Sequence, residues 1–408
     1  MPGPLGVTAV ADALSAALAG GPALAPVPVG PADSGYLTRV RAALRPDDAE
    51  APLERHDVVA VVATSGSTGD PKGVLITEAA MRAAVAGFHA AFGGPAHWVV
   101  AMPVHAVGGL MVVARSVIGG TTLHVDPSVG GAASFDPIVF AGTVAAARAE
   151  VGSEPLFCSL VPTQLHRIVD AGEVGMMALR SLDAVISGAA ATPATLLEPL
   201  RTLGIRVHTS YGMSETCAGC GYDGIPLPGV SFRTDAPDGR ALGRITVTGA
   251  QVAAGYRLRP DPAFTGGRVV TGDLGTVSQD GHVTLVGRVD DVVVVGGTNV
   301  ALPAVEEVLR AVPGVRDACV VALPDPEWGA RLVGYVVAAD DPGGPVDSAL
   351  GAAVREALGR AAVPRRFVRT PASRGIPLLA TGKPDRAALL AHAATLPPAD
   401  GSDRPPEA

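Results

Sequence analysis

The sequence has 408 residues, a length typical of two or three domains. Its residues are 48% hydrophobic and 17% charged, a balance typical of a folded chain and not of a disordered one. Its formal net charge of −8 argues against nucleic acid or an anionic membrane as the main partner. The sequence lacks an apolar run of the length, about 18 residues, of a membrane-spanning helix, and its first basic residue is Arg39, so we expect a cytoplasmic protein without a signal peptide.

Short apolar segments alternate with helical patterns from residue 57 to about residue 212. The segments that predict strands are Val58–Ala63, Trp98–Met102, Thr122–Val125, Leu156–Val161, Ala184–Ile186 and Arg206–Thr209. The predicted helices are Glu78–Phe92, Pro137–Glu150, Gln164–Asp170 and Ala194–Leu203. Strands that alternate with helices of this length indicate βαβ units, so the predicted fold class is α/β with a mostly parallel sheet.

The pattern changes after this region. Residues 239–288 read as short strands and turns, with a hairpin at Gln279–His282, and predict a small β subdomain of the first domain. The elements expected beyond it are the strand Val292–Val295, a Gly296-Gly297 turn, the helix Pro303–Ala311, the strands Ala318–Leu323 and Leu332–Ala338, and the helix Asp347–Leu358. We therefore predict a large domain of residues 1–289, a small α+β domain of residues 290–395, and a disordered tail of residues 396–408.

Lysine is almost absent from the chain. Only two of the 31 basic residues are lysine, Lys72 and Lys383. Lysine is a compact point charge with rotatable donors, so in an arginine-rich chain it marks places that meet a single phosphate or oxyanion. Lys72 lies in Thr64-Ser-Gly-Ser-Thr-Gly-Asp-Pro-Lys-Gly73, and Lys383 lies in Thr381-Gly-Lys-Pro-Asp-Arg386. Both lysines are therefore candidate catalytic residues.

The loop around Lys72 predicts a phosphate site. Its glycines let the backbone approach a ligand closely, and its hydroxyl side chains offer donors. It is not a Walker A loop, because Gly69 is followed by Asp70-Pro71 and not by Lys-Ser/Thr. Four further segments come in a fixed order after this loop: Ser187–Ala190, Ser210–Thr216, Thr271–Gly275 and Gly287–Val292.

Together with the two lysine motifs, these segments resemble the acyl-adenylate-forming superfamily, which includes acyl-CoA synthetases, luciferases and peptide-synthetase adenylation domains. The resemblance implies a large domain joined to a mobile small domain, ATP and coenzyme A as co-substrates with a carboxylic acid, and Mg²⁺ as cofactor. The nucleotide-binding residues that it implies are Thr64, Ser65, Gly66, Ser67, Thr68, Gly69, Lys72, Ser187, Gly188, Ala189, Ala190, Tyr211, Gly212, Ser214, Asp273, Arg288 and Lys383.

The resemblance also assigns individual roles. Tyr211 would stack on adenine, and Asp273 would accept hydrogen bonds from the ribose hydroxyls. Glu215 would bind Mg²⁺, and Asp290 would be the hinge between the domains. Lys383 would bridge the acid and the α-phosphate while Lys72 holds the other phosphates. Ser214 stands where the family usually has threonine, and the hydroxyl is kept.

The identity of the acid is suggested by a narrower resemblance. The large domain is short for the superfamily, and this compact form, with the segments Ser159–Leu165 and Ser214–Val230, resembles actinobacterial 2-succinylbenzoate–CoA ligases of menaquinone biosynthesis. The acid-binding residues that this implies are His105, Arg115, Thr163 and Gln164. A charge at Arg115, inside an apolar helical run, needs a partner, either a second carboxylate of the substrate or a structural carboxylate or carbonyl. His105 lies one place before the position where such ligases often have histidine, so a packing role stays open.

Three alternatives remain: another aryl or acyl acid–CoA ligase, an adenylation domain that loads a carrier protein, and a non-catalytic nucleotide-binding module. Amino-acid-adenylating domains usually place an aspartate near Met102–Gly109, and none is there. A non-catalytic module could lose Lys383, which this chain keeps. Cys217 and Cys220 have CxxC spacing but lack a second pair or nearby histidines, so we expect two small residues in a tight loop. Whether the protein is a homodimer stays open.

Overall fold

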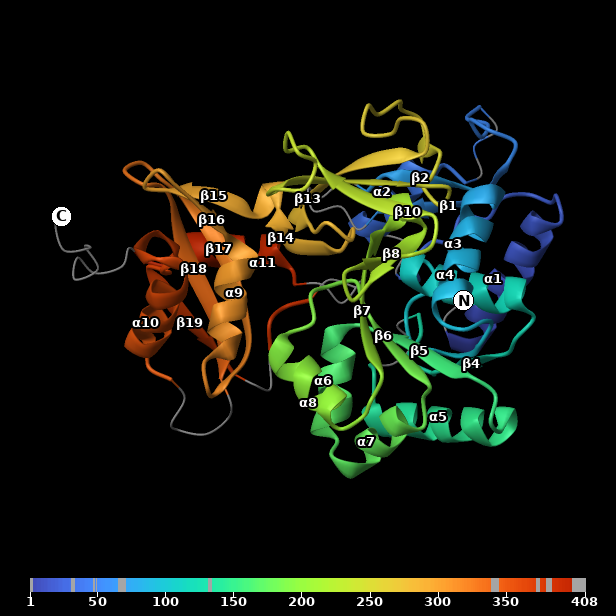
Figure 1. The fold of residues 1–408 in the computed structure, drawn as a ribbon, viewed down its shortest axis with the longest axis horizontal. Coiled ribbons are helices and arrows are strands. Elements are labelled where there is room, and N and C mark those ends of the chain that lie inside the picture. The colour runs from blue at the N-terminus through green and yellow to red at the C-terminus, as the bar shows by residue number, and fades with distance from the viewer. Residues whose placement is uncertain are drawn as a thin grey trace. The chain divides into compact units, whose positions relative to one another are not determined.

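The structure is a computed structural model and describes residues 3–30, 34–46, 48, 50–64, 71–130, 134–338, 345–371, 375–378 and 384–397. The chain divides into two compact units (Figure 1). The first comprises residues 1–240, 246–271 and 277–283, and the second comprises residues 241–245, 272–276 and 284–408. The last continuous segment of the second unit thus begins six residues before Asp290. Asp290 as the hinge, and the boundary there, stay predictions.

A seven-stranded sheet forms the centre of the first unit. In spatial order its strands are β4 (Leu123–Val125), β3 (His97–Val100), β5 (Leu156–Leu160), β6 (Ala184–Ser187), β7 (Val207–Met213), β8 (Ala218–Tyr222) and β9 (Ile225–Pro226). The pairs from β4 to β7 are parallel, and β8 and β9 are antiparallel additions. The predicted α/β class with a mostly parallel sheet is therefore confirmed.

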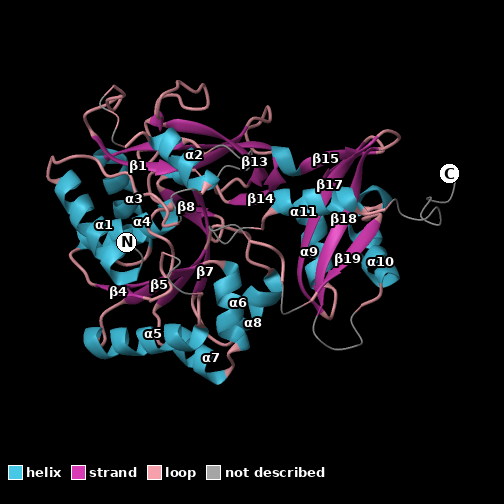
Figure 2. Cartoon of the chain, turned by 180° about the vertical axis from the view of Figure 1, so that it is seen from behind, coloured by secondary structure: helices cyan, strands magenta, loops and turns pink. Residues whose placement is uncertain are grey.

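Eight helices of the first unit are described (Figure 2). They are α1 (Gly3–Leu18), α2 (Gly35–Leu44), α3 (Glu78–Ala91), α4 (Val107–Gly119), α5 (Pro137–Val151), α6 (Pro162–Asp170), α7 (Glu173–Arg180) and α8 (Ala194–Thr202). The four helices that the sequence predicted are confirmed as α3, α5, α6 and α8, and the apolar helical run around Arg115 is confirmed as α4, whereas α1, α2 and α7 were not predicted. None of the described helices is both long enough and apolar enough to cross a membrane.

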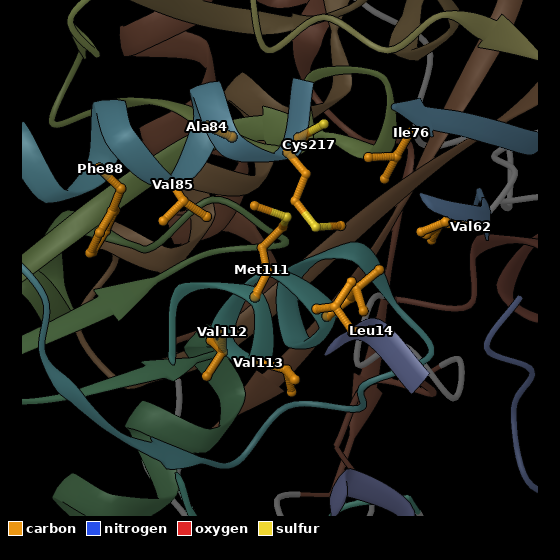
Figure 3. Close-up of a cluster of buried hydrophobic side chains, with 14 of the residues drawn as sticks. Leu14, Val62, Ile76, Ala84, Val85, Phe88, Met111, Val112, Val113 and Cys217 are labelled. Atoms are coloured by element: carbon orange, nitrogen blue, oxygen red, sulfur yellow. The ribbon is translucent and has the colours of Figure 1, made fainter. Parts of the chain in front are cut away.

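Both faces of the parallel sheet are covered, because neighbouring strand residues point to opposite sides. Trp98 and Val100 of β3 pack with α1, α3 and α4, and Val99 packs with α5 to α8. Figure 3 shows part of the first cluster, with Phe88 of α3 and Met111 of α4 among the labelled side chains. Strands buried on both faces read as continuous apolar runs, which is why the sequence identified them.

The first predicted strand does not belong to this sheet. β1 (Val58–Ala63) pairs antiparallel with β2 (Gly73–Thr77), and β12 (Gly255–Tyr256) completes a separate three-stranded sheet. Only nine residues, 64–72, connect β1 to β2. A parallel crossover needs a dozen or more residues, so this connection fixes an antiparallel pair. Our placement of Val58–Ala63 among the parallel βαβ units was wrong.

A four-stranded sheet corresponds to the predicted β subdomain. Its order is β10 (Val230–Thr234), β11 (Gly243–Gly249), β13 (Arg268–Val277) and β14 (Val283–Arg288). The β13–β14 turn lies at the predicted hairpin, where the Ser278 N–H donates to the His282 carbonyl (2.9 Å) and Gly281 has a φ of +86°. The hairpin prediction is confirmed. Strands β11, β13 and β14 contribute residues to both compact units.

The second unit is an α+β structure. Its strands are β15 (Val292–Val295), β16 (Thr298–Ala301), β17 (Val315–Asp325), β18 (Gly329–Ala338) and β19 (Arg366–Thr370), and its helices are α9 (Leu302–Ala311), α10 (Asp347–Leu358) and α11 (Arg386–Thr395). α9 and α10 pack on one face of the β17–β18–β19 sheet, and α11 packs on the other. The predicted Val292–Val295 strand, Gly296-Gly297 turn and Asp347–Leu358 helix are confirmed. Most of the predicted tail lies outside the described residues.

Candidate active site

Several predicted site residues of the first unit lie at or just after the carboxyl ends of the parallel strands. Residues 101–106 come after β3, residues 161–164 after β5, and residues 188–190 after β6, while residues 210–213 form the end of β7. The carboxyl ends of parallel strands share one edge of a sheet, and ligands of such sheets bind at that edge. Topology therefore gathers these segments, although they are distant in the sequence.

The turn after β6 is held close to β7. The Gly188 N–H donates to the Leu160 carbonyl (3.0 Å), and a Cβ added at Gly188 would lie 2.4 Å from the Ser210 hydroxyl oxygen. The next residue, Ala189, has a φ of +66°, which is unusual for a residue with a side chain. Strained backbone of this kind is often found at ligand sites. The two predicted nucleotide segments Ser187–Ala190 and Ser210–Thr216 are thus neighbours.

The end of β7 turns sharply into a 3-10 turn, Ser214–Thr216. A Cβ at Gly212 would lie 1.9 Å from the Ala218 carbonyl oxygen, so this position requires glycine. The Thr216 hydroxyl donates to Ala218 O (2.8 Å) and accepts from the Met213 N–H (3.0 Å). These bonds fix the backbone on both sides of Ser214 and Glu215. The Tyr211 ring lies 5.7 Å from the Phe232 ring, centroid to centroid.

The two ends of the predicted phosphate loop are bonded to each other. The Thr64 N–H donates to the Lys72 carbonyl (2.8 Å), and the Lys72 N–H donates to the Thr64 hydroxyl oxygen (3.0 Å). Ser65, Gly66, Ser67, Thr68 and Gly69 lie outside the described residues. The role of this loop in phosphate binding stays a prediction.

Tyr256 connects Lys72 to Glu215. Its hydroxyl donates to Glu215 Oε1 (2.7 Å), and the Lys72 ammonium nitrogen lies 4.4 Å from the centroid of its ring. Burial and the adjacent Glu215 carboxylate raise the pKa of Tyr256, which keeps the phenol a hydrogen-bond donor. Lys72 Nζ also lies 3.7 Å from Asp261 Oδ2. The sequence reasoning missed Tyr256 and Asp261, and the only available signal was the rarity of aromatic residues, 4% of the chain.

The residues around Glu215 fit a magnesium ion that is held mainly by a nucleotide. Among the described residues, no three His, Cys, Asp or Glu side chains lie together as a metal cluster. Mg²⁺ usually keeps several waters and is bound by one or two carboxylates together with substrate phosphates. A single carboxylate, fixed by Tyr256 near the lysine of the phosphate loop, is compatible with that arrangement.

His105 lies in the turn between β3 and α4. It is mostly buried, and this burial lowers the pKa of its imidazole to about 4, so the ring is neutral near pH 7. Its Nε2 atom is buried without a hydrogen-bond partner in the described structure. A contact of His105 with the acid and a packing role for its ring both stay predictions.

Arg115 is buried in an aromatic cluster. Its guanidinium donates to the Tyr222 hydroxyl (3.0 Å), and its Cζ atom lies 3.9 Å from the Phe88 ring centroid and 5.4 Å from that of Trp98. No ion pair to Arg115 is found within the described part of the chain. These contacts give Arg115 a packing role, and its contact with a substrate carboxylate stays a prediction.

Gln164 already has backbone partners. Its Nε2 donates to the Ala101 carbonyl (2.8 Å), and its Oε1 accepts from the Val161 N–H (3.0 Å). The side chain therefore joins the end of β3 to the start of α6. Thr163, the neighbouring predicted residue, is partly buried. A contact of either residue with the acid stays a prediction.

Three of the predicted residues that the structure describes belong to the second unit. Arg288 Nη1 donates to Asp273 Oδ1 (2.9 Å), and a Cβ at Gly272 would lie 2.8 Å from Arg288 Nη2. The absence of a side chain at Gly272 thus lets the arginine reach the carboxylate. Asp290 is exposed and lies in the 3-10 turn Val289–Asp291.

Lys383 lies outside the described residues, but the chain on both sides of it is anchored. Leu378 and Pro384 form a β-bridge, and the Asp385 side chain caps α11 by accepting from the Ala388 N–H (3.0 Å). Arg386 pairs with the buried carboxylate of Glu306, Nη2 to Oε1, at 2.7 Å. The segment that carries Lys383 thus begins and ends at fixed points of the second unit.

Comparisons with known proteins identify related sequences along most of the chain. Residues 25–257 match the AMP-binding enzyme family, and residues 304–383 match the AMP-binding enzyme C-terminal domain. A protein of Mycobacterium tuberculosis (strain CDC 1551 / Oshkosh) described as a probable 2-succinylbenzoate–CoA ligase is 38% identical over 340 residues, which cover 82% of this chain and 84% of that protein.

Two solved enzymes share the fold. The amide bond synthetase McbA of Marinactinospora thermotolerans aligns with a TM-score of 0.72 at 28% identity, covering 84% of this chain and 70% of that chain. The o-succinylbenzoate CoA synthetase of Bacillus subtilis, in complex with the acyl-adenylate intermediate OSB-AMP, aligns with a TM-score of 0.67 at 25% identity, covering 83% and 70%. The Bacillus enzyme has also been solved with ATP and a magnesium ion.

Proposed function

Because this chain belongs to the AMP-binding enzyme family, we propose that it is an AMP-forming acid–thiol ligase that joins 2-succinylbenzoate to coenzyme A. One observation carries the proposal. The turn Ser187–Ala190 and the segment Ser210–Thr216 meet at the carboxyl edge of the parallel sheet, in a chain that is 38% identical to a probable 2-succinylbenzoate–CoA ligase.

The first half-reaction activates the acid. A carboxylate oxygen of the acid attacks the α-phosphorus of ATP, a new O–P bond forms, the bond to the β-phosphate breaks, and pyrophosphate leaves. Catalysis of such a step consists mainly of positioning and of stabilising the charge on the phosphoryl oxygens. Lys72 would hold the phosphates distant from the reacting atom, and Lys383 would contact the acid and the α-phosphate. Bound Mg²⁺, held by Glu215, would neutralise phosphate charge.

The second half-reaction transfers the acyl group. The thiol sulfur of coenzyme A attacks the activated carbonyl carbon, a C–S bond forms, the C–O bond to AMP breaks, and the thiol proton is released. Lys383 is not required in this step. We propose that the second unit turns about Asp290 between the two steps, so that Lys383 leaves and the thiol enters.

The acid would be recognised on the first unit. A neutral His105, whose Nε2 has no partner within the described structure, provides one polar group beside the β3–α4 turn. 2-Succinylbenzoate carries two carboxylates, of which the succinyl one is activated. Arg115 is our candidate for recognising the ring carboxylate, directly or through water.

ATP–pyrophosphate exchange tests the proposal. The protein is incubated with ATP, Mg²⁺ and labelled pyrophosphate, with 2-succinylbenzoate, benzoate, succinate or a medium-chain fatty acid as the acid. We expect exchange to be fastest with 2-succinylbenzoate, and exchange that is equal for all acids, or faster with another, would contradict the assigned substrate.

The acceptor is tested separately. Product analysis with coenzyme A, a phosphopantetheinyl carrier protein or a simple amine should give the coenzyme A thioester. The amine is included because the amide bond synthetase McbA shares the fold.

A further inference from the structure

Tyr256 lies between two side chains of opposite charge. Its hydroxyl donates to Glu215 Oε1 (2.7 Å), and the face of its ring receives the Lys72 ammonium at 4.4 Å from the centroid. No ion pair within 4.0 Å joins Lys72 to Glu215, both of which are described. The lysine instead has a loose pair with Asp261, at 3.7 Å. Both charged side chains therefore contact Tyr256, the lysine at the ring face and the carboxylate at the hydroxyl.

The main chain fixes the position of this ring. Tyr256 pairs with Val74 of β2, and the Arg257 N–H donates to the Gly73 carbonyl (2.7 Å), directly after Lys72. The Ala253 N–H donates to the Glu215 carbonyl oxygen (2.9 Å). Residues 253–257 are thus bonded to the chain beside Lys72 and to Glu215 itself. The Tyr256 side chain sits at a fixed point between the two motifs.

Opposite charges attract, so without an intervening group the Lys72 ammonium and the Glu215 carboxylate would form a direct ion pair. A lysine paired with Glu215 would no longer be free for a phosphate, and the carboxylate would no longer be free for a cation. A tyrosine satisfies both partners in a different way. Its ring face attracts the ammonium, and its hydroxyl gives the carboxylate a hydrogen bond without cancelling its charge.

We propose that Tyr256 is a positioning residue with two separate actions. Its ring keeps the Lys72 ammonium apart from the Glu215 carboxylate, so that the lysine remains available to the phosphates of ATP. Its hydroxyl orients the Glu215 carboxylate toward the divalent cation. The inference rests on the proposed function, because that function assigns Lys72 to the phosphates and Glu215 to the metal.

Two substitutions separate the two actions. Tyr256→Phe removes the hydroxyl and keeps the ring, and Tyr256→Leu removes both. Binding of ATP is measured by isothermal titration calorimetry with EDTA, which removes divalent cations, and again across a Mg²⁺ titration. For Tyr256→Phe we expect an unchanged Kd for metal-free ATP and an increase of about tenfold in the half-saturating Mg²⁺ concentration, the size typical for loss of a partner of a metal ligand. For Tyr256→Leu we expect the same change in Mg²⁺ dependence and, in addition, metal-free ATP binding that is about tenfold weaker, because Lys72 no longer makes its charge-assisted contact with the phosphates.

A double variant tests why Tyr256→Leu binds metal-free ATP more weakly. If the lysine in Tyr256→Leu is captured by the carboxylate, then adding Glu215→Gln should release it. The double variant should bind metal-free ATP as tightly as Glu215→Gln alone. A structural effect of the leucine would not be reversed in this way.

Tyr335→Phe is the matched control, because it removes a phenol hydroxyl in the second unit, where that hydroxyl donates to the Leu389 carbonyl (3.0 Å). It should change neither binding constant. Metal-free binding of ATP that is native-like in Tyr256→Leu, or that Glu215→Gln does not restore, would overturn the role of the ring. A Mg²⁺ dependence that is native-like in Tyr256→Phe would overturn the role of the hydroxyl. Because this variant keeps the ring, it tests the hydroxyl even if Tyr256→Leu does not fold.

The outcome is distinguishable from a failure of the proposed function. Metal-free ATP binding requires no acid, so a protein that binds ATP and shows the expected variant pattern but activates no 2-succinylbenzoate would refute only the substrate. A native protein that binds no ATP would refute both.

Discussion

His105 is predicted to make the stability of the first unit depend on pH. Burial lowers the pKa of His105 from 6.5 to about 4, so the folded state prefers the neutral ring. In the unfolded state the ring takes up a proton near pH 6.5, and the stability is therefore fully present above that pH and is lost as pH falls toward 4. A pKa lowered from 6.5 to about 4 contributes about 3.4 kcal/mol to the free energy of unfolding at pH values above 6.5. About 2 kcal/mol of this contribution is lost when the pH falls to 5.

The assay compares the native protein with His105→Gln, whose amide does not titrate. Unfolding in urea is followed by fluorescence at pH 7.5 and pH 5.0 in a Trp328→Phe background, which leaves the buried Trp98 of the first unit as the only tryptophan. The native protein should lose about 2 kcal/mol more than His105→Gln between the two pH values. Burial also lowers the pKa values of His89 and His124, but both residues are present in the two proteins and their contributions cancel.

The pH window and the control complete the design. The pKa of Asp223 is lowered to about 2 by hydrogen bonds and nearby charges that outweigh its burial, so its contribution is lost only as pH falls from 3.8 toward 2, below the window. His56→Gln removes an exposed histidine and should follow the native protein. An equal loss of stability in native protein and His105→Gln would refute the reasoning.

Three further predictions concern catalysis. Lys383→Ala should slow adenylation by about three orders of magnitude but largely spare thioester formation from pre-made acyl-adenylate, in single-turnover assays of each step; equal losses would make the lysine structural. Asp290→Pro should slow thioester formation more than adenylation in the same assays, because proline fixes φ near −65° and would restrict a hinge, and equal effects would place the hinge elsewhere. Arg115→Gln should lower kcat/KM for 2-succinylbenzoate about ten- to a hundredfold and hardly change that for an analogue without the ring carboxylate; equal losses for both acids would mean that Arg115 only packs against Tyr222 and Phe88.

Local chemistry allowed much of the fold to be predicted. Strands such as Leu156–Leu160 are buried on both faces, so their residues are apolar without interruption. The helix Asp347–Leu358 and the turn at Gly296-Gly297 are also encoded locally, by amphipathic spacing and by glycines that adopt positive φ. Strand direction is not encoded locally, and Val58–Ala63 was placed wrongly because a pattern of apolar residues does not identify the neighbouring strand.

The sequence by itself determined the α/β class, most elements of the two parts of the chain, and the motifs with their two lysines, because each depends on residues close together along the chain. Only the tertiary structure decided which distant residues meet. It bonded Tyr256 to Glu215 across 41 residues and packed Arg115 against Tyr222 across 107. It also buried the Nε2 atom of His105 where no other described residue offers it a hydrogen bond. The physical reason is that burial, pKa and ion pairing depend on neighbours in space, which strand order and helix packing supply and local residue patterns do not specify.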